Sequence, residues 1–494
     1  MGGVNRTVLR FALALVSLTV LLGACATVPD GRRPAAPVVS WPGSPADTAA
    51  ISWHAPHREA AIELVGPDGG SRFYDARETR GFASVELDGL APGSVYRYRV
   101  AGEERWHSFR TLPAAPERLS FAIVGDLQPF NEETDRTTSL VVDKVSSLAP
   151  DFVLQMGDIA EIGILESSWR RAIAILSGLA AETPVVPVAG NHDYYYGIPS
   201  ARIFKSVFPI AYADDAPRRN TWHSVTVGPL HIAVLDTEAD GERFDRQLAW
   251  LADDLRAARN AEVPWIFVAM HRPILASTVA REDPRWAREL FGLFSEFGVD
   301  AAFWGHDHLF EHYAYTHGAN GLVFKEGDSP ADGPVHLFTT GSAGSRIDAL
   351  YPGFFTHRPF REERTFISLD DGGEVTRVFV QRPWQRERAK TEGAGVRYQD
   401  PSVYPKAASY FSFPFDDAAA EAAEEYSDDP SVRYSDDADF YGYTYGETSI
   451  HYLWVEVTGE RCTVTAHYAD GDAGEHGTVI TTPTGTPMRF ELGE

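Results

Sequence analysis

Apolar and polar residues follow two different rhythms along the chain. Over residues 49–113 short runs alternate, as in VYRYRV at 95–100, which has the two-residue period of a half-buried strand. Turn sequences such as GPDGG at 66–70 and LAPG at 90–93 separate these runs. This first rhythm predicts a small all-β sandwich over residues 49–113.

Longer, fully apolar runs begin after residue 117 and predict strands that are buried on both faces. They lie at 119–124, 152–156, 185–189, 230–235, 265–270 and 301–304. An amphipathic stretch at 245–255 places Leu248, Leu251 and Leu255 on one face of a helix. Strands that alternate with helices predict a layered α/β domain, which we place at residues 117–385.

The composition changes again in the C-terminal part of the chain. Residues 386–440 include the acidic, aliphatic-poor stretch 416–440, which predicts a solvated insert or loop. Residues 441–494 contain two alternating runs, at 450–457 and 462–467, whose spacing is typical of a β-hairpin. This pattern leaves open whether the hairpin closes the α/β domain or forms a separate domain.

The N-terminus has the features of an export signal. Arg6 and Arg10 precede an apolar run at 11–22, which is too short for a comfortable bilayer-spanning helix. The run ends in Leu-Gly-Ala-Cys, which resembles the lipobox of bacterial lipoproteins. That resemblance implies a signal peptide at 1–24 that is cleaved before a lipidated Cys25; an uncleaved anchor and a plain signal peptide are the alternatives.

A Pro-, Ala-, Gly- and Ser-rich segment follows at 25–48 and predicts a semi-extended tether. The formal net charge of -26 argues against nucleic acid or anionic lipid as general partners, because both are negatively charged. The chain has only two cysteines, Cys25 and Cys462, which excludes a disulfide scaffold and a thiolate metal site.

Residues able to bind metal follow five of the six predicted buried strands. They are Asp126, Asp158, the run Asn191-His192-Asp193, His271, and the pair His306 and His308. Ligands of α/β sheets collect at the carboxyl ends of the strands, so we expect these side chains to meet at one edge. Glycine precedes four of the five groups and allows a sharp turn toward an ion. The pattern predicts a metal centre of oxygen and imidazole donors.

The order GD…GD…GNHD…H…GHDH over about residues 119–310 resembles the calcineurin-like metallophosphoesterase superfamily. QLAWLADDL at 247–255 and GHDHLFEH at 305–312 resemble its purple acid phosphatase branch. LDGLAPGSVYRYRV at 87–100 resembles a fibronectin type III sandwich, in which the first Tyr after the turn packs back in a corner. The resemblance implies a four-layer α/β metallophosphoesterase sandwich preceded by a small fibronectin-like domain.

The resemblance also implies roles for the metal-capable residues. Asp158 would bridge two metal ions, with Asp126 and His308 completing site one. Asn191, His271 and His306 would complete site two. His192 would protonate the leaving oxygen, and Asp193 would orient the imidazole of His192.

Two positions depart from the family pattern. Glu161 stands where the purple acid phosphatases have a tyrosine ligand, and Gln128 stands where the wider superfamily has a histidine. Gln128 is therefore either a weak oxygen ligand of site one or a hydrogen-bonding wall residue. Oxygen donors suit Mn²⁺, Fe²⁺ or Mg²⁺, and the implied cofactor is a pair of divalent or trivalent Mn, Fe or Zn ions.

Together these features predict a membrane-anchored, exported hydrolase of small phosphate esters, with monoesters slightly favoured over diesters. Two ions about 3.5–4 Å apart would share a water that loses a proton and becomes the nucleophile. The alternative is a non-catalytic or weakly active metal-binding surface lipoprotein. Metal identity, oligomeric state and the exact substrate do not follow from the sequence.

Overall fold

The computed structural model describes most of the chain from residue 35 onward. The described residues are 35–55, 60–194, 201–213, 221–239, 241–275, 284–330, 333–345, 361–380, 433–434, 443–447, 450–469 and 488–492. The predicted signal peptide, Cys25 and most of the predicted acidic insert at 386–440 lie outside these residues. Among the helices that are described, none combines the length and the apolar character needed to cross a membrane.

Two large β-sheets dominate the described part of the chain. The first contains, in spatial order, β25 (Met488–Leu492), β24 (Cys462–Tyr468), β23 (His451–Thr458), β9 (Arg118–Val124), β10 (Phe152–Gln155), β11 (Val185–Pro187), β1 (Val38–Ser40), β2 (Ala49–His54), β6 (Phe82–Leu87) and β5 (Arg77–Thr79). The second contains β12 (His223–Val227), β13 (Leu230–Val234), β14 (Trp265–Met270), β15 (Ala301–Trp304), β18 (Val335–Thr340), β16 (Phe310–Tyr315) and β22 (Tyr443–Glu447). Parallel pairing joins β9 to β10 to β11 and β13 to β14 to β15.

The sheets pack face to face because alternate side chains of each strand point in opposite directions. In β9, Phe121 and Ile123 enter the core between the sheets, whereas Ala122 and Val124 face the other way. The strands of the second sheet divide in the same manner. Each sheet is therefore buried on both faces, as the continuous apolar runs predict.

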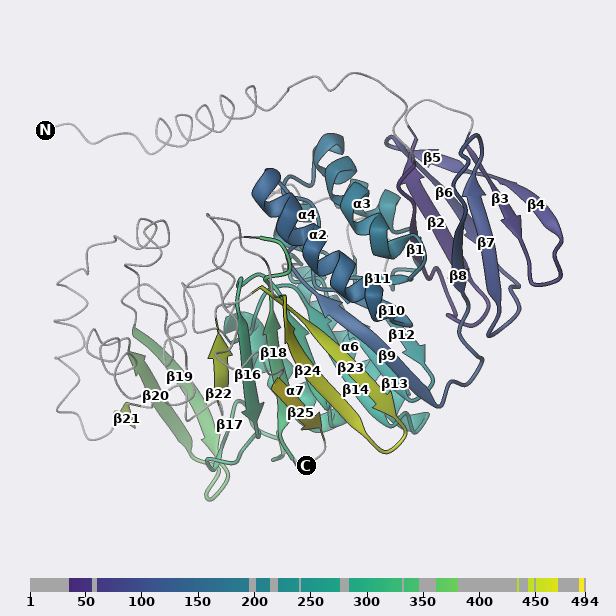
Figure 1. Cartoon of the computed structure of the whole chain (residues 1–494). Helices are drawn as coiled ribbons and strands as arrows, with labels where there is room; N and C mark the ends of the chain where they lie inside the picture. The colour runs from purple at the N-terminus through teal and green to yellow at the C-terminus, as the bar shows by residue number, and fades with distance from the viewer. Residues whose placement is uncertain are drawn as a thin grey trace, which may run out of the picture. The chain divides into compact units, whose positions relative to one another are not determined.

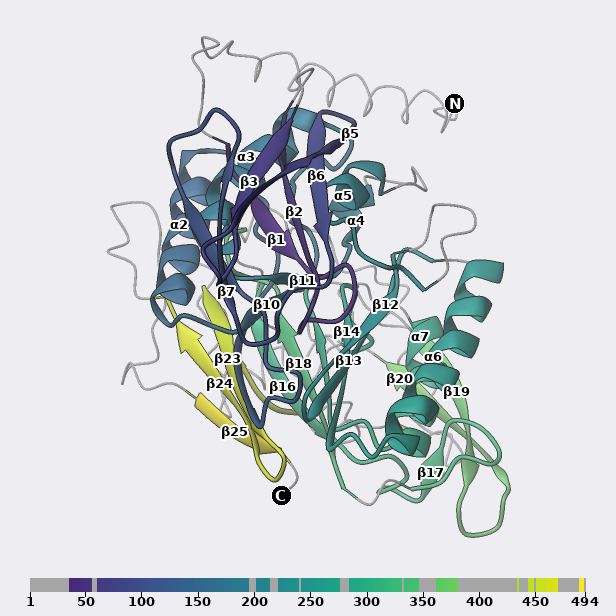
Figure 2. The same ribbon diagram turned by 90° about the vertical axis from the view of Figure 1, so that its right-hand side faces the viewer.

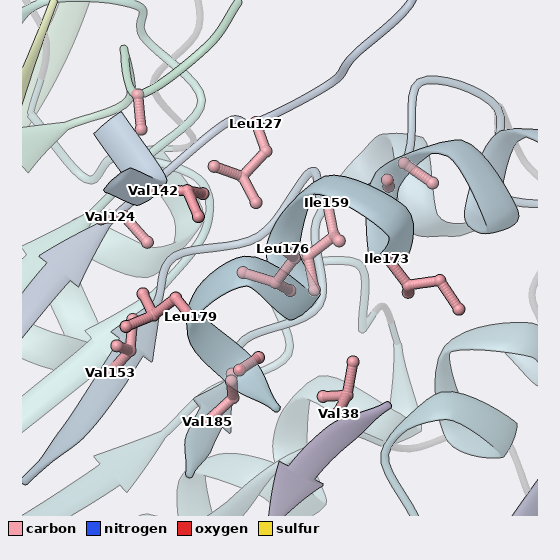
Figure 3. Close-up of a cluster of buried hydrophobic side chains, with 14 of the residues drawn as sticks. Val38, Val124, Leu127, Val142, Val153, Ile159, Ile173, Leu176, Leu179 and Val185 are labelled. Atoms are coloured by element: carbon pink, nitrogen blue, oxygen red, sulfur yellow. The ribbon is translucent and has the colours of Figure 1, made fainter. Parts of the chain in front are cut away.

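Helices cover the outer face of each sheet and complete four layers. The helices α2 (Glu132–Ser147) and α3 (Glu166–Ala180) pack on β9 and β10, and α6 (Glu242–Asn260) and α7 (Pro284–Phe297) pack on β13–β15 (Figures 1 and 2). Figure 3 shows Leu179 of α3 beside Val153 of the first sheet, and Leu176 and Ile173 of the same helix belong to the same buried cluster. The four-layer arrangement agrees with the sequence prediction.

The described elements from residue 38 to residue 110 are all strands. A smaller sheet, separate from the two large ones, contains β4 (Ser71–Asp75), β3 (Ala61–Val65), β7 (Val95–Val100) and β8 (His107–Arg110). Tyr96 folds back on the preceding turn, where its hydroxyl oxygen accepts a hydrogen bond of 2.7 Å from the backbone N–H of Ala91. Such a bond is the corner expected for a tyrosine at this position of a β-sandwich.

The prediction of a tether over residues 25–48 is wrong for Val38–Ser40. These residues form the buried strand β1, which pairs in parallel with β11 and antiparallel with β2. Two β-branched residues make a strand possible, and the short β11 leaves its edge open to accept one. The N-terminal strands thereby continue the first large sheet instead of hanging from a flexible linker.

The C-terminal hairpin closes the α/β domain, which answers the question that the sequence leaves open. Its strand β23 pairs antiparallel with β9 over Leu453↔Ile123 to Thr458↔Arg118. The strand β22 likewise completes the second sheet beside β16. The α/β domain therefore extends beyond its predicted end at residue 385. Cys462, in β24, is a buried free thiol.

Smaller elements connect these layers. They are the short helices α4 (Asn191–Tyr194) and α5 (Arg202–Val207), and a small sheet of β17 (Leu322–Val323), β19 (Arg361–Ser368), β20 (Glu374–Val380) and β21 (Arg433–Tyr434).

Candidate metal centre

The carboxyl ends of strands from both large sheets meet at one place. Asp126, Asp158 and Asn191 follow β9, β10 and β11 of the first sheet, and His271, His306 and His308 follow β14 and β15 of the second. Apart from the half-buried Asn191, each of these side chains is at least nine-tenths buried. The first sheet contributes oxygen atoms and the second contributes imidazole nitrogens.

Three of these side chains converge on the imidazole of His271. Its Nε2 atom lies 3.0 Å from Asn191 Oδ1, 3.3 Å from Asp158 Oδ1 and 3.2 Å from His306 Nδ1. Asp158, His271 and His306 form the one group of three or more metal-capable His, Cys, Asp or Glu residues found among the described residues. The predicted members of site two are thus in mutual contact.

The spacing and chemistry of this cluster fit a metal ion. Ligand atoms about 2.1 Å from a shared ion lie about 3.0 Å apart at a right angle and about 3.4 Å apart at a tetrahedral angle. The observed separations fall in this range. In addition, His271 Nδ1 donates to the backbone carbonyl of Met156 at 2.9 Å, which leaves the Nε2 lone pair for a cation.

The predicted site one is more open in its contacts. Asp126 Oδ2 accepts a hydrogen bond of 2.9 Å from the backbone N–H of His306, and Asp126 Oδ1 lies 3.5 Å from His308 Nε2. Among the described residues, Asp126 Oδ1 has no hydrogen-bond partner although it is buried. A buried carboxylate oxygen is costly without a partner, so this atom also fits a cation.

The carboxylate of Asp158 divides its oxygens between the two predicted sites. Its Oδ1 faces His271 and also accepts a bond of 2.8 Å from the backbone N–H of His192, whereas its Oδ2 accepts a bond of 3.1 Å from Gln128 Nε2. The two oxygens of Asp158 thus face different groups, which is compatible with a carboxylate shared by two cations. Gln128 turns its amide nitrogen, a donor, toward Asp158, as a hydrogen-bonding wall residue does.

The backbone at the ligands is held in a left-handed conformation that is rare without glycine. The φ angles are 54° at Asp126, 36° at Gln128, 53° at Asp158 and 69° at His306. Each such residue costs about 1–3 kcal/mol and persists only where the surrounding structure enforces it. The fold therefore spends stability to aim these side chains.

The glycines before the ligands are needed mainly for close approach. A Cβ atom on Gly190 would lie 2.1 Å from Asp158 Oδ1, and one on Gly157 would lie 2.4 Å from His271 Nδ1. Of the four glycines that precede ligand groups, Gly157 alone has a left-handed φ angle, of 96°. The expected sharp turn thus explains Gly157, and lack of space explains Gly190.

The centre attracts positive charge. Burial by itself would lower the pKa of His271, but the charge of Asp158 and their contact raise it to about 9. Burial would raise the pKa of Asp158, yet the His271 and His192 charges hold it well below its usual range. Burial raises the pKa of Asp126. Groups that stabilise a proton on His271 in this way equally stabilise a bound cation.

The contacts of Asp193 differ from the role that the family resemblance implies. Asp193 Oδ1 accepts from the backbone N–H groups of Ile159 and Ala160, both at 3.2 Å, and its Oδ2 accepts from Gly190 at 3.0 Å. The imidazole of His192 instead donates from Nδ1 to the backbone carbonyl of Glu161 at 2.7 Å. Asp193 therefore ties together the loops that carry Asp158 and Asn191, and burial raises its pKa to about 8.

The sequence analysis assigns no site residue to the end of the predicted strand at 230–235. Thr237 and Glu238 come after β13, and Glu238 Oε1 accepts from Arg272 Nε. Arg272 Nη1 lies 3.3 Å from His306 Nε2, so this group borders the centre. The strand-end rule that found the other ligands applies equally to the predicted strand at 230–235. His231 of β13 contacts Asp254, and His336 of β18 contacts His312.

The comparisons with known proteins agree with this geometry. Residues 119–310 match the model of the calcineurin-like phosphoesterase family. The mixed α/β metallophosphoesterase fold predicted from the sequence is confirmed.

Curated relatives define the class further. The chain is 28% identical over 262 residues to purple acid phosphatase 18 of Arabidopsis thaliana, covering 52% of this chain and 56% of that protein. It is 28% identical over 310 residues to acid phosphatase type 7 of Mus musculus, covering 57% of this chain and 68% of that protein. The chain therefore spans little more than half of the length of the first of these relatives.

Solved structures show the same fold. One is a purple acid phosphatase, PPD1, from yellow lupin (Lupinus luteus) seeds, with a TM-score of 0.61, 13% identity and coverage of 93% of this chain and 74% of that chain. Another is PhoD, with a TM-score of 0.54, 13% identity and coverage of 89% and 87%. At this identity the likeness concerns the fold alone.

Proposed function

We propose that the protein hydrolyses phosphate monoesters with the help of two metal ions. The convergence of Asp158 Oδ1, Asn191 Oδ1 and His306 Nδ1 on His271 Nε2, at 3.0–3.3 Å, is the observation that carries this proposal. The phosphatase relatives support the reaction class. The preference for monoesters rests on the resemblance of this chain to the purple acid phosphatases.

In this proposal Asp158 is shared between two ions. Asp126 and His308 complete one site, and Asn191, His271 and His306 complete the other. Two metal ions held by these residues would supply Lewis-acid stabilisation of the phosphoryl group and a water activated as a nucleophile near neutral pH. His192, whose Nδ1 is held by the Glu161 carbonyl, directs its Nε2 edge to the leaving oxygen and protonates it.

We further propose that the enzyme works outside the cytoplasm as a lipoprotein anchored through Cys25. The charged start, the short apolar run and the Leu-Gly-Ala-Cys sequence support this location. The Tyr96–Ala91 contact supports a fibronectin type III-like fold for the N-terminal strands. Cell fractionation tests the anchor: the wild-type chain should sediment with membranes, and Cys25→Ala should not carry lipid by mass spectrometry.

Turnover tests the main proposal. The full-length chain, purified in detergent with Mn²⁺, should hydrolyse p-nitrophenyl phosphate faster than bis(p-nitrophenyl) phosphate. Asp158→Ala should hydrolyse neither. The proposal fails if the wild type turns over neither ester or if Asp158→Ala keeps full turnover.

One observation favours a second function, that of a metal-binding surface protein with little turnover. The Gln128 side chain presents an N–H donor to Asp158 Oδ2, where the wider family has an imidazole ligand. Site one would then bind its ion weakly. Stoichiometric metal with no hydrolysis of either ester would support this second function.

A further inference from the structure

Arg272 occupies a constrained position at the edge of the metal centre. It follows His271 directly, and its backbone N–H donates to Thr237 Oγ1 at 3.1 Å. Its Nε donates to Glu238 Oε1, and its Nη1 lies 3.3 Å from His306 Nε2. The side chain remains 29% exposed. The guanidinium is thus anchored on one edge, and its Nη1 points at a predicted metal ligand.

The contact between Arg272 and His306 depends on which nitrogen of His306 carries a hydrogen. Arginine can only donate, so His306 Nε2 accepts from it only while the hydrogen is on Nδ1. Yet Nδ1 is the nitrogen that faces His271 Nε2, where the lone pairs of the predicted metal ligands meet. A neutral imidazole that gives its Nδ1 lone pair to a cation carries its hydrogen on Nε2.

The loaded centre would therefore place two N–H donors, from His306 Nε2 and Arg272 Nη1, side by side. Two donors at this distance are satisfied when one anionic oxygen accepts from both. Glu238 keeps the guanidinium in place meanwhile, because it binds the opposite edge at Nε.

We propose that Arg272, with His306, binds a terminal oxygen of the phosphoryl group and thereby selects phosphate monoesters over diesters. This inference rests on the proposed function. A monoester has three terminal oxygens, so it can offer one to Arg272 while two face the metal ions. A diester has two, and its third position carries a second ester group that cannot accept a charge-assisted hydrogen bond of comparable strength.

Phosphate binding tests this role without turnover. The full-length Mn²⁺-loaded protein, freed of excess metal, is titrated with inorganic phosphate by calorimetry. Arg272→Gln should weaken the affinity on the order of 10- to 100-fold, as for loss of a charge-assisted hydrogen bond. Arg272→Lys should recover only part of the loss, because lysine lacks the planar fork. Glu238→Gln should weaken binding less than Arg272→Gln does.

Two comparisons make the test specific. Arg171→Gln removes an exposed arginine that pairs with Asp135 and with no residue assigned to the centre, and it should leave phosphate affinity unchanged. Dimethyl phosphate, which has two terminal oxygens, should bind wild type more weakly than phosphate does, and Arg272→Gln should narrow this difference. Metal content by elemental analysis should be the same in all variants.

Two results would overturn the inference: Arg272→Gln with its full metal content and phosphate affinity within about twofold of wild type, or an equal loss for phosphate and dimethyl phosphate. If the wild type hydrolyses neither test ester, the proposed function fails on its own, and the phosphate titration still decides the role of Arg272.

Discussion

The two halves of the metal centre differ in how completely the protein prepares them. In the half around His271, three lone-pair atoms lie 3.0–3.3 Å from His271 Nε2, and the Met156 carbonyl orients the imidazole. In the half around Asp126, His308 Nε2 lies 3.5 Å from Asp126 Oδ1, and Gln128 turns a donor toward the carboxylate of Asp158.

The difference shows that one fold can prepare one metal site fully while a single residue, Gln128, weakens the other. In the His271 half, each side chain directs a lone-pair atom toward the cluster, and a cation can use that atom. Gln128 instead directs its N–H group toward Asp158. We therefore expect two ions of unequal affinity, with the tighter ion beside His271.

The largest effect should come from Asp158, the residue common to both halves. Asp158→Asn removes the charge that would hold both ions but keeps the size of the side chain. We expect turnover of p-nitrophenyl phosphate to fall on the order of 10³-fold or more, because the electrostatic stabilisation of the reaction is lost with the metal. Steady-state kinetics with excess Mn²⁺ measure this, and a loss below about tenfold would argue against a shared carboxylate.

The two halves should separate when one imidazole is removed from each. His271→Ala should abolish the tight ion, whereas His308→Ala should retain it and lose only the weak one. Elemental analysis after dialysis against metal-free buffer distinguishes the variants, with circular dichroism as the control for folding. Equal metal loss in both variants would remove the contrast.

Imidazoles outside the centre should respond to acid in the opposite direction from His271. His312 Nε2 and His336 Nδ1 lie 3.0 Å apart on β16 and β18. Burial lowers the pKa of His312 to about 2 and, for the same reason, that of His336 to about 4. Because these folded-state values lie below the unfolded value of about 6.5, stability is complete above that pH and falls as the pH drops below it.

The expected loss at pH 5 is about 2 kcal/mol for each imidazole. Urea unfolding of the metal-free protein at pH 7.5 and pH 5.0 measures it. The double variant His312→Gln and His336→Gln should lose less stability between the two values than wild type does. If both proteins lose the same amount, the neutral histidine pair does not contribute to acid sensitivity.

The smallest effect should come from restoring an imidazole at Gln128. Gln128→His should tighten the weak ion about tenfold, since changes around metal ligands alter affinity by about 10- to 100-fold. Gln128→Ala should leave the tight ion in place. A Mn²⁺ titration of the three proteins provides the measurement, and an unchanged weak site in Gln128→His would place this residue outside the centre.

The core of the fold and most of the candidate centre follow from the sequence. The predicted strands at 265–270 and 301–304 coincide with β14 and β15, because strands buried on both faces need unbroken apolar runs. The same runs point to the convergence of Asp126, Asp158, Asn191 and the three histidines at one sheet edge, as the structure shows.

Other features could not be read from the sequence because they depend on distant partners. Val38–Ser40 forms a strand between β2 and β11, the latter about 145 residues later, and its three residues are too few to show a period. The partners of Asp193 are backbone N–H groups, which no residue type reveals. Arg272 is held at the edge of the centre by its contacts with Glu238 and His306, and neither residue is near it in the chain.

Equilibrium binding of Mn²⁺ to the metal-free wild-type chain tests the central claim most directly. The account predicts two ions per chain with clearly different dissociation constants, and Asp158→Ala should bind neither. Two ions bound with one common affinity, or two ions still bound by Asp158→Ala, would contradict an unequal centre built on one shared carboxylate.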